Sequence, residues 1–253
     1  MSGLGPLLRK ELTEQWRTRR LVIVGIVFLV LGIISPITAK YLPELIGVIG
    51  TGEIVIEVPP PTINDAMAQI VRQISQFGLL IAFLLAMGSM AGERERGTAP
   101  FVLTKPVSRG AFLGAKAAAL GVVLLSAMLM AGLGGYVYSV ILFETPDLAA
   151  FVGMHALLLL QLLTIASIVL LASTVAPSTI AAGGIALGIV IVASIVSVVP
   201  AIGEYMPTAL ATVATLVGIG EPVDNLAGPV VVSLLVIAAS LGIAWLSFRR
   251  QEL

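Results

Sequence analysis

Long stretches without a single charged residue constrain this chain more than any other feature. The first of them, residues 21–39, would form a helix about 28 Å long, which matches the hydrocarbon core of a membrane. Across the chain 58% of the residues are hydrophobic and only 11% are charged, whereas roughly a quarter are charged in an ordinary soluble domain. The sequence therefore predicts an integral membrane protein.

The apolar stretches divide into segments that are long enough to cross a membrane as helices. We expect one transmembrane domain over residues 1–253, all-α, with six spans at residues 21–39, 70–92, 110–143, 150–175, 180–203 and 229–248. Thr62 and Asp65 have the spacing of a capping box, so the second helix should begin near Ile63 and project beyond the membrane. Between Glu204 and Leu226 the apolar run is short and flanked by prolines, which favours a re-entrant or interfacial helix before the last span.

Residues 4–20 predict an amphipathic helix that lies in the plane of the membrane surface. Its apolar side chains recur every four residues, at Leu4, Leu8, Leu12 and Trp16. A charged leader that only orients the first span is one alternative. A twin-arginine export signal is another, since Arg19 and Arg20 precede an apolar run. Because that run is longer than a typical signal core, we favour an uncleaved anchor.

The segment after the first span, residues 40–61, is expected to be a loop. Its EIVIEV sequence at residues 53–58 suggests a short strand, and the three prolines at 59–61 exclude a helix. In this topology all but two of the 14 Lys and Arg residues, Lys40 and Arg72, lie on the side of the termini. The positive-inside rule then places both termini in the cytoplasm. We expect the protein to lie in the cell (plasma) membrane.

The sequence lacks the residues that several classes of function require. No span has a charged residue near its middle, which argues against a proton- or sodium-coupled carrier. The chain has no G-x-x-x-x-G-K-[ST] phosphate loop, no cysteine and one histidine, His155. It has no polybasic block that would suggest nucleic acid. We therefore expect no catalytic, cofactor-binding or metal-binding residue and no ATP hydrolysis by this chain.

The loop between the second and third spans, residues 93–109, is the stretch with the clearest functional signal. Its charged, helix-breaking and capping residues, with one lysine inside the next span, are Glu93, Arg94, Glu95, Gly97, Thr98, Pro106, Ser108, Arg109 and Lys116. Marking the water boundary would alone explain the charges, but it would explain the helix breakers less readily. The apolar residues between them suit a membrane surface or a partner protein.

Two pairs of glycines have the four-residue spacing that lets helices pack closely. They are Gly88 with Gly92 and Gly184 with Gly188. For both pairs we favour packing within the helix bundle over a seam between two copies of the chain.

Residues 92–116 resemble the permease subunits of type-2 ABC exporters. The resemblance lies in G-E-R-E-R-G-T, then P-V-S-R, then a lysine seven residues after that arginine. It extends to essentially the whole chain through the K-E-L at Lys10, Glu11 and Leu12, the six-span layout and the proline-bearing segment before the last span.

The resemblance implies an ATP-driven exporter built from two permease subunits, identical or different, and separate cytoplasmic ABC ATPase subunits that bind ATP and Mg²⁺. It implies an elbow helix at residues 4–20, with Lys10, Glu11, Leu12 and Trp16, and an ATPase-coupling role for loop 93–109. A cargo path between spans two and five would be lined by Gln76, Met87, Ser194 and Ser197. Two other functions stay open: a membrane assembly or anchoring factor that recruits a cytoplasmic partner, and a channel or carrier that works without one.

Overall fold

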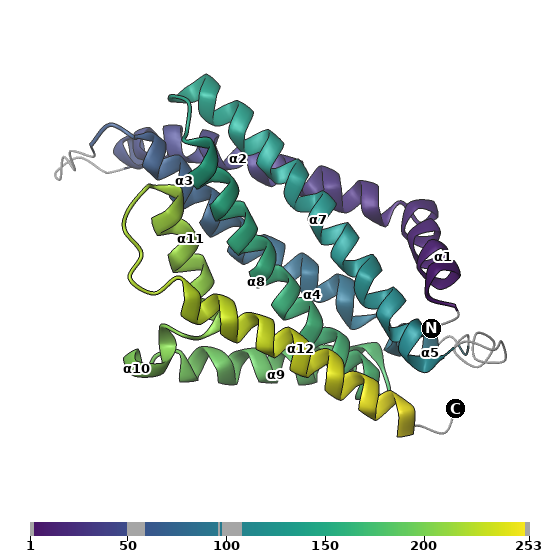
Figure 1. The fold of residues 1–253 in the computed structure, drawn as a ribbon. Coiled ribbons are helices and arrows are strands. Elements are labelled where there is room, and N and C mark those ends of the chain that lie inside the picture. Colours follow the sequence, from purple (N-terminus) through teal and green to yellow (C-terminus); the bar gives the residue numbers. More distant parts are fainter. Residues whose placement is uncertain (1–2, 50–58, 96, 98–107, 251–253) are drawn as a thin grey trace.

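The computed structural model describes residues 3–49, 59–95, 97 and 108–250, which are almost entirely helical (Figure 1). Six helical segments are long and apolar enough to cross a membrane: Arg20–Leu42, Ile63–Glu95, Arg109–Leu142, Leu148–Val175, Thr179–Val196 and Ala227–Arg250. The described residues contain no strand, so the predicted all-α fold with six spans is confirmed. The strand suggested for residues 53–58 lies outside the described residues.

The elements follow one another with short connections. The elbow helix is α1 (Leu4–Arg17), and the first span belongs to α2 (Arg20–Ile49). The second span consists of α3 (Ile63–Gln73), the π-helix η1 (Ile74–Gly78), α4 (Leu79–Met87) and α5 (Ala91–Glu95). The remaining elements are α7 (Arg109–Leu142), α8 (Leu148–Val175), α9 (Thr179–Val196), α10 (Pro200–Gly203), η2 (Pro207–Ala209), α11 (Leu210–Gly218) and α12 (Ala227–Arg250).

Two predicted boundaries are wrong. The first helix continues past Lys40 to Ile49 instead of giving way to a loop, and the Lys40 ammonium lies 5.0 Å from the centre of the Phe143 ring. The fifth span was expected to reach residue 203, but its helix ends at Val196. Proline cannot continue the hydrogen-bonding pattern of a helix, and Pro200 instead opens the short α10.

The start of the second span and the short helix before the last span agree with the sequence. The Asp65 carboxylate accepts hydrogen bonds from the backbone N–H of Thr62, at 2.7 Å, and from its hydroxyl, at 2.8 Å. Pro207 begins the short apolar stretch that forms η2 and α11, and this stretch precedes α12.

Helix α8 is the centre of the bundle and has α12, α11, α4, α9 and α7 packed around it (Figure 1). Its largest fully buried side chains are Met154, Leu158, Leu162 and Leu170. Gln161, also in α8, accepts a hydrogen bond from Ser75 in the π-helix of the second span, at 3.3 Å. The second and fourth spans are thereby joined by a polar contact inside an otherwise apolar core.

Spans one and three pack closely because glycines leave room for the backbones. A Cβ at Gly32 would collide with the carbonyl of Ala131, and a Cβ at Gly134 would lie 2.8 Å from the carbonyl oxygen of Leu29. Small residues let helices in a membrane approach until dispersion forces between them become large. These two glycines therefore fix the crossing of α2 and α7.

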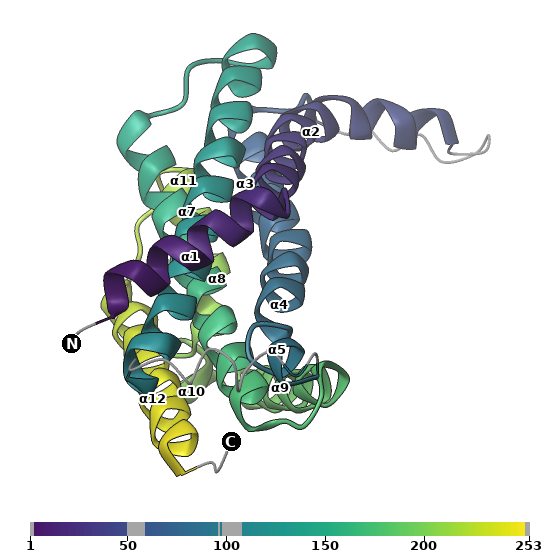
Figure 2. The ribbon, with the colours of Figure 1, turned by 90° about the vertical axis from the view of Figure 1, so that its right-hand side faces the viewer.

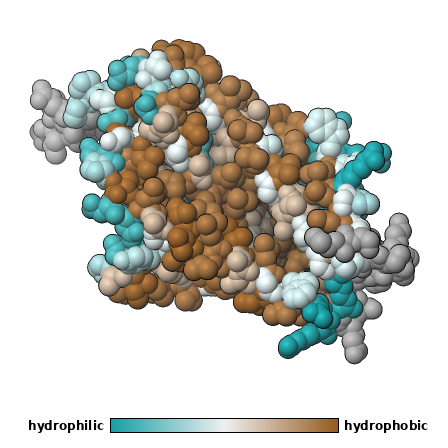
Figure 3. Space-filling model, in the orientation of Figure 1, coloured by the Kyte–Doolittle hydropathy of each residue, from teal (hydrophilic) through white to brown (hydrophobic). Residues whose placement is uncertain are grey.

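The surface has the pattern expected of a protein that spans a membrane. Figure 3 shows a broad hydrophobic band across the middle of the molecule, with hydrophilic residues gathered at both ends. Both chain termini lie at one end of the bundle, which we call the terminal end (Figures 1 and 2). The other is the distal end. The protein is a multi-pass membrane protein.

The two glycine pairs have different surroundings. A Cβ at Gly88 or Gly92 would contact Thr179 at the start of α9, so this pair packs within the bundle as predicted. At Gly184 and Gly188 such a Cβ would lie in open space in the described chain. The prediction that this pair packs within the bundle is therefore wrong. Helix α9 keeps this face open because it meets the rest of the bundle mainly along one side, against α8 and α4.

Candidate functional site

The second span is interrupted just before it leaves the membrane, and a serine from the fourth span fills the break. Ser173 in α8 is fully buried, and its hydroxyl donates a hydrogen bond to the Met87 carbonyl at 2.7 Å. The same oxygen accepts from the backbone N–H groups of Met90, at 3.1 Å, and Ala91, at 3.0 Å. One side chain therefore serves three backbone groups that the interrupted helix would leave unpaired.

Beyond this break the charged end of the second span holds the turn between α8 and α9. The Arg94 guanidinium donates to the carbonyls of Ala176 and of Thr174, the latter at 2.8 Å. The Glu95 carboxylate accepts from the backbone N–H of Thr179, at 2.9 Å, and from its hydroxyl, at 2.8 Å. Each charge has the sign that its helix end favours, since carbonyls accumulate at the C-terminus and N–H groups at the N-terminus.

The helix-breaking and capping residues on the two sides of loop 93–109 end or begin their helices in different ways. Gly97 adopts the left-handed conformation, with φ of 65°, and its N–H donates to the Arg94 carbonyl at 3.1 Å. Thr98 and Pro106 lie outside the described residues. On the far side of the loop, the Ser108 hydroxyl accepts from the Ala111 N–H at 3.1 Å, which confirms the predicted N-cap of the third span.

Arg109 joins the start of the third span to the end of the last. Its guanidinium donates to the carbonyls of Phe248, at 2.8 Å, and Arg249, at 3.1 Å, at the C-terminus of α12. The same guanidinium lies 5.7 Å from the centre of the Phe248 ring, which in turn stacks on Phe112 at 5.9 Å. The end of α12 is therefore held beside the C-terminal end of loop 93–109.

Lys116 stands at the centre of an ion cluster that joins three elements. Its ammonium lies 2.7 Å from the carboxylate of Glu93, at the end of the second span, and 3.4 Å from both oxygens of Glu11, in the elbow helix. Only 6% of the side chains of Lys116 and Glu11 is exposed. Lys116 therefore connects the elbow helix, the end of the second span and the third span from within the bundle.

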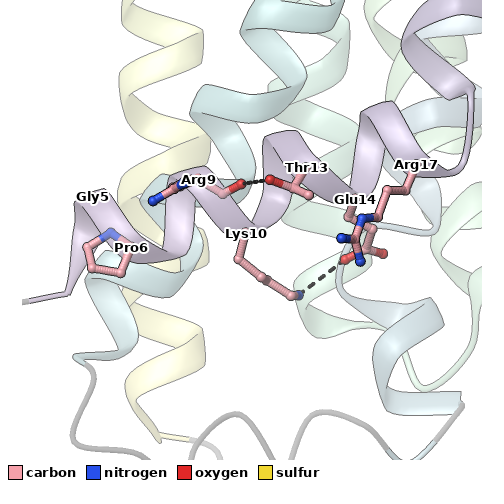
Figure 4. Close-up of a pocket in the computed structure, with 7 residues that line it drawn as sticks. All are labelled: Gly5, Pro6, Arg9, Lys10, Thr13, Glu14 and Arg17. Atoms are coloured by element: carbon pink, nitrogen blue, oxygen red, sulfur yellow. Dashed lines mark hydrogen bonds and ion pairs between the residues drawn. The ribbon is translucent and has the colours of Figure 1, made fainter.

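Lys10 extends this cluster toward the surface. Its ammonium is 2.9 Å from Glu11, 3.3 Å from Glu14 and 3.5 Å from Glu93. Partial burial by itself would lower the pKa of Lys10, but the hydrogen bond and charge of Glu11, with Glu93 and Glu14, outweigh it and raise that pKa. Lys10 therefore stays charged at every physiological pH. Figure 4 shows the Lys10 side chain reaching toward Glu14 along the elbow helix.

The face of the elbow helix that packs against the bundle is not its leucine stripe. Leu7 and Glu11 are its buried residues and pack toward α7, whereas Leu12 is half-buried and Trp16 is 64% exposed. The apolar stripe that ends at Trp16 is thus left free to contact lipid.

The four residues expected along a cargo path differ in exposure and in hydrogen-bond partners. Gln76 and Ser194 are exposed, and Met87 and Ser197 are half-buried. The Ser194 hydroxyl donates to the Val190 carbonyl of its own helix, and the Ser197 hydroxyl pairs with that of Thr208 at 2.6 Å. Among the described residues no hydrogen bond joins any two of the four.

Sequence reasoning missed the partners that hold the end of the second span. Ser173 and Thr179 lie more than 80 positions from the residues that they contact, in or beside apolar runs. Nothing local marks them as different from other small polar residues of membrane helices. The residue spacing within one segment does not predict a contact between two distant segments.

Two comparisons with known proteins cover nearly the whole chain. A family model described as "ABC-2 family transporter protein" matches residues 6–227. The chain is also 27% identical over 257 residues to "Uncharacterized transmembrane protein YxlG" of Bacillus subtilis (strain 168), an alignment that covers 100% of this chain and 99% of the relative.

Proposed function

Because the chain belongs to the ABC-2 family of transporter proteins and is the transmembrane permease of an ABC transporter, we propose that it drives export when cytoplasmic ABC ATPase subunits dock on its terminal end. In this family the permease is typically the non-catalytic membrane subunit and associates with an ABC ATPase. ATP and Mg²⁺ would bind to that partner. Loop 93–109 would be the contact, with both termini cytoplasmic and the plasma membrane as the site of action.

The observation that carries this proposal is the way in which the loop is attached. Glu93 reaches the elbow helix and the third span through Lys116, while Arg94 and Glu95 hold the junction of the fourth and fifth spans. Arg109 fastens the sixth. A loop connected in this way passes a displacement to the helices as rigid bodies, which is what a motor that moves a membrane domain requires.

The proposal is tested by co-purifying the full-length protein with its candidate ATPase and following its shape with nucleotide. Since the chain has no cysteine, a single cysteine at Asp224, near the distal end, takes one spin label per copy. We expect ATP to change the distance between labels in the assembled complex. Glu95→Gln, which weakens the hold on the fifth span, should reduce that change several-fold while the ATPase still co-purifies.

Glu144→Gln is the matched control, because Glu144 is an exposed carboxylate at the distal end. It should leave the nucleotide response unchanged. If an ATPase binds but no nucleotide moves the labels, an anchoring or assembly factor is the better description. If no ATPase binds and the protein alone carries solutes across vesicles, it is a channel or carrier. Because the ATPase is cytoplasmic, its binding at the terminal end also tests the orientation.

We further propose that α9 lies at the seam with a second permease subunit, which here is a second copy. Only 11% of this span is buried within one chain, and Gly184 and Gly188 face open space on it. Such glycines let two helices approach closely. Gly188→Cys should therefore form an intermolecular disulfide readily in membranes, whereas Val122→Cys on the exposed face of α7 should not. Equal cross-linking at both positions would argue against this seam.

A further inference from the structure

A charged cavity of about 230 Å³ lies at the terminal end, between the elbow helix, the end of the second span and the start of the fifth. One side is formed by Glu14, Gln15 and Arg20, at the joint between α1 and α2. The opposite side includes Glu93 and Thr179. Glu93 and Glu95, at the start of loop 93–109, line the cavity together with Glu11 and Lys116 of the ion cluster.

Two groups on the joint side of this cavity have no partner in the part of the chain that the structure describes. Arg20 is exposed to solvent and forms no salt bridge there, although it carries a full positive charge. The amide oxygen of Gln15 is buried and accepts no hydrogen bond. Leaving a buried acceptor unpaired costs about 1–3 kcal/mol. Both groups therefore favour a ligand, one that brings an anion to Arg20 and a hydrogen-bond donor to Gln15.

Carboxylates near Gln15 also favour a ligand with a positively charged hydrogen-bond donor. The Glu14 side chain is 42% exposed and, within the described part of the chain, forms one ion pair, to Lys10 at 3.3 Å, so it keeps acceptor capacity toward the cavity. The cavity wall thus carries the guanidinium of Arg20 and the ammonium of Lys116, the carboxylates of Glu11, Glu14, Glu93 and Glu95, and the amide of Gln15. Groups of both signs favour a ligand that itself carries both a positive and a negative charge.

The position of the cavity along the bundle indicates which molecules could supply such a ligand. Arg20 is the first residue of the first span, Glu95 is the last of the second and Thr179 is the first of the fifth. All three line the cavity. The boundary between apolar spans and charged ends is where lipid headgroups lie.

We propose that this cavity binds the phosphoethanolamine headgroup of a membrane phospholipid. The lipid phosphate would pair with Arg20, whose planar guanidinium suits two phosphate oxygens, and the primary ammonium would donate to Gln15 and Glu14. With about 30 Å³ per water-sized group, the cavity has room for the roughly eight heavy atoms of phosphoethanolamine. A quaternary choline has no N–H to donate, so the site selects against it. The proposal is independent of whether an ATPase docks.

The test uses the full-length protein in nanodiscs that contain phosphatidylglycerol with an equal amount of phosphatidylethanolamine or phosphatidylcholine. After extraction, native mass spectrometry counts the lipids that each chain retains. We expect phosphatidylethanolamine to be retained about tenfold more than phosphatidylcholine, as the loss of a charge-assisted hydrogen bond implies. Arg20→Gln should lower the retention of phosphatidylethanolamine and phosphatidylcholine alike, because both carry the phosphate that Arg20 would pair with. Glu14→Gln should reduce the preference for phosphatidylethanolamine without reducing retention of phosphatidylglycerol.

Arg19→Gln is the matched control, because Arg19 is the neighbouring cation, is exposed like Arg20 and does not line the cavity. It should leave the retention of both lipids and the preference between them intact. Equal retention of the two zwitterionic lipids overturns the proposal. So does an equal loss in the Arg19 and Arg20 variants, which would show general attraction to a charged surface. A further arm supplies glycerophosphoethanolamine in solution: Arg20-dependent competition supports the headgroup chemistry, and failure to compete at any concentration contradicts it.

Discussion

Replacing Lys116 with methionine is expected to lower the thermal unfolding temperature of the purified protein by about 6–20 °C. Removing one partner of a buried ion pair leaves the others uncompensated, which costs about 3–5 kcal/mol, and each kcal/mol shifts the transition by about 2–4 °C in a chain of this size. Here the charges left behind are Glu11 and Glu93, of which Glu11 is as deeply buried as Lys116. Scanning fluorimetry in a mild detergent measures the change.

Lys10→Met is the control for that experiment. The Lys10 side chain is 43% exposed, so its ion pairs are screened by water and should contribute less than about 1 kcal/mol. The double variant Glu93→Gln with Lys116→Met should be more stable than Lys116→Met alone, because it removes one of the two carboxylates that lose the Lys116 ammonium. If the two single lysine variants lose equal stability, the buried cluster does not hold the elbow helix to the spans.

Ser173→Ala should produce the second large loss, about 2–4 kcal/mol, although it removes a single oxygen atom. The Met87 carbonyl and the N–H groups of Met90 and Ala91 would all lose their partner in a place that water does not reach. Each unsatisfied buried group costs about 1–3 kcal/mol, and partial relaxation offsets some of the sum. The same scan in detergent, supplemented by proteolysis near the end of the second span, measures the effect.

Ser139→Ala is the matched control, since Ser139 is equally buried and its hydroxyl has no hydrogen-bond partner among the described residues. Removing that hydroxyl should be neutral or slightly stabilising. Similar losses in both variants would mean that the volume of the hydroxyl matters rather than its bonds, and the role given to Ser173 would be wrong.

The spans and caps could be predicted because their causes are local. Hydrophobic length defines a crossing, and a capping residue such as Ser108 acts on a backbone group three positions away. The bounds that failed, near Lys40 and Val196, are places where an apolar helix can end at several positions. There the choice depends on neighbours such as the Phe143 ring, which the sequence does not place.

The candidate site was predictable as a set of residues but not as an arrangement. Glu11, Glu93 and Lys116 each carry a charge close to an apolar span, and the sequence favoured all three for a role at this end. Their mutual pairing depends on how the elbow helix crosses the third span, which only tertiary packing determines. The same holds for Arg94 and Glu95, whose partners are the unpaired ends of two distant helices.

The grip of Lys116 on Glu11 has a mechanical consequence for the proposed exporter. With Trp16 projecting outward and Glu11 locked inward, the elbow helix must travel with the second and third spans whenever they tilt. It would then displace the neighbouring phospholipids on every turnover. Part of the work released by ATP would be spent against the lateral pressure of that leaflet, so membrane stiffness would set the speed of the stroke.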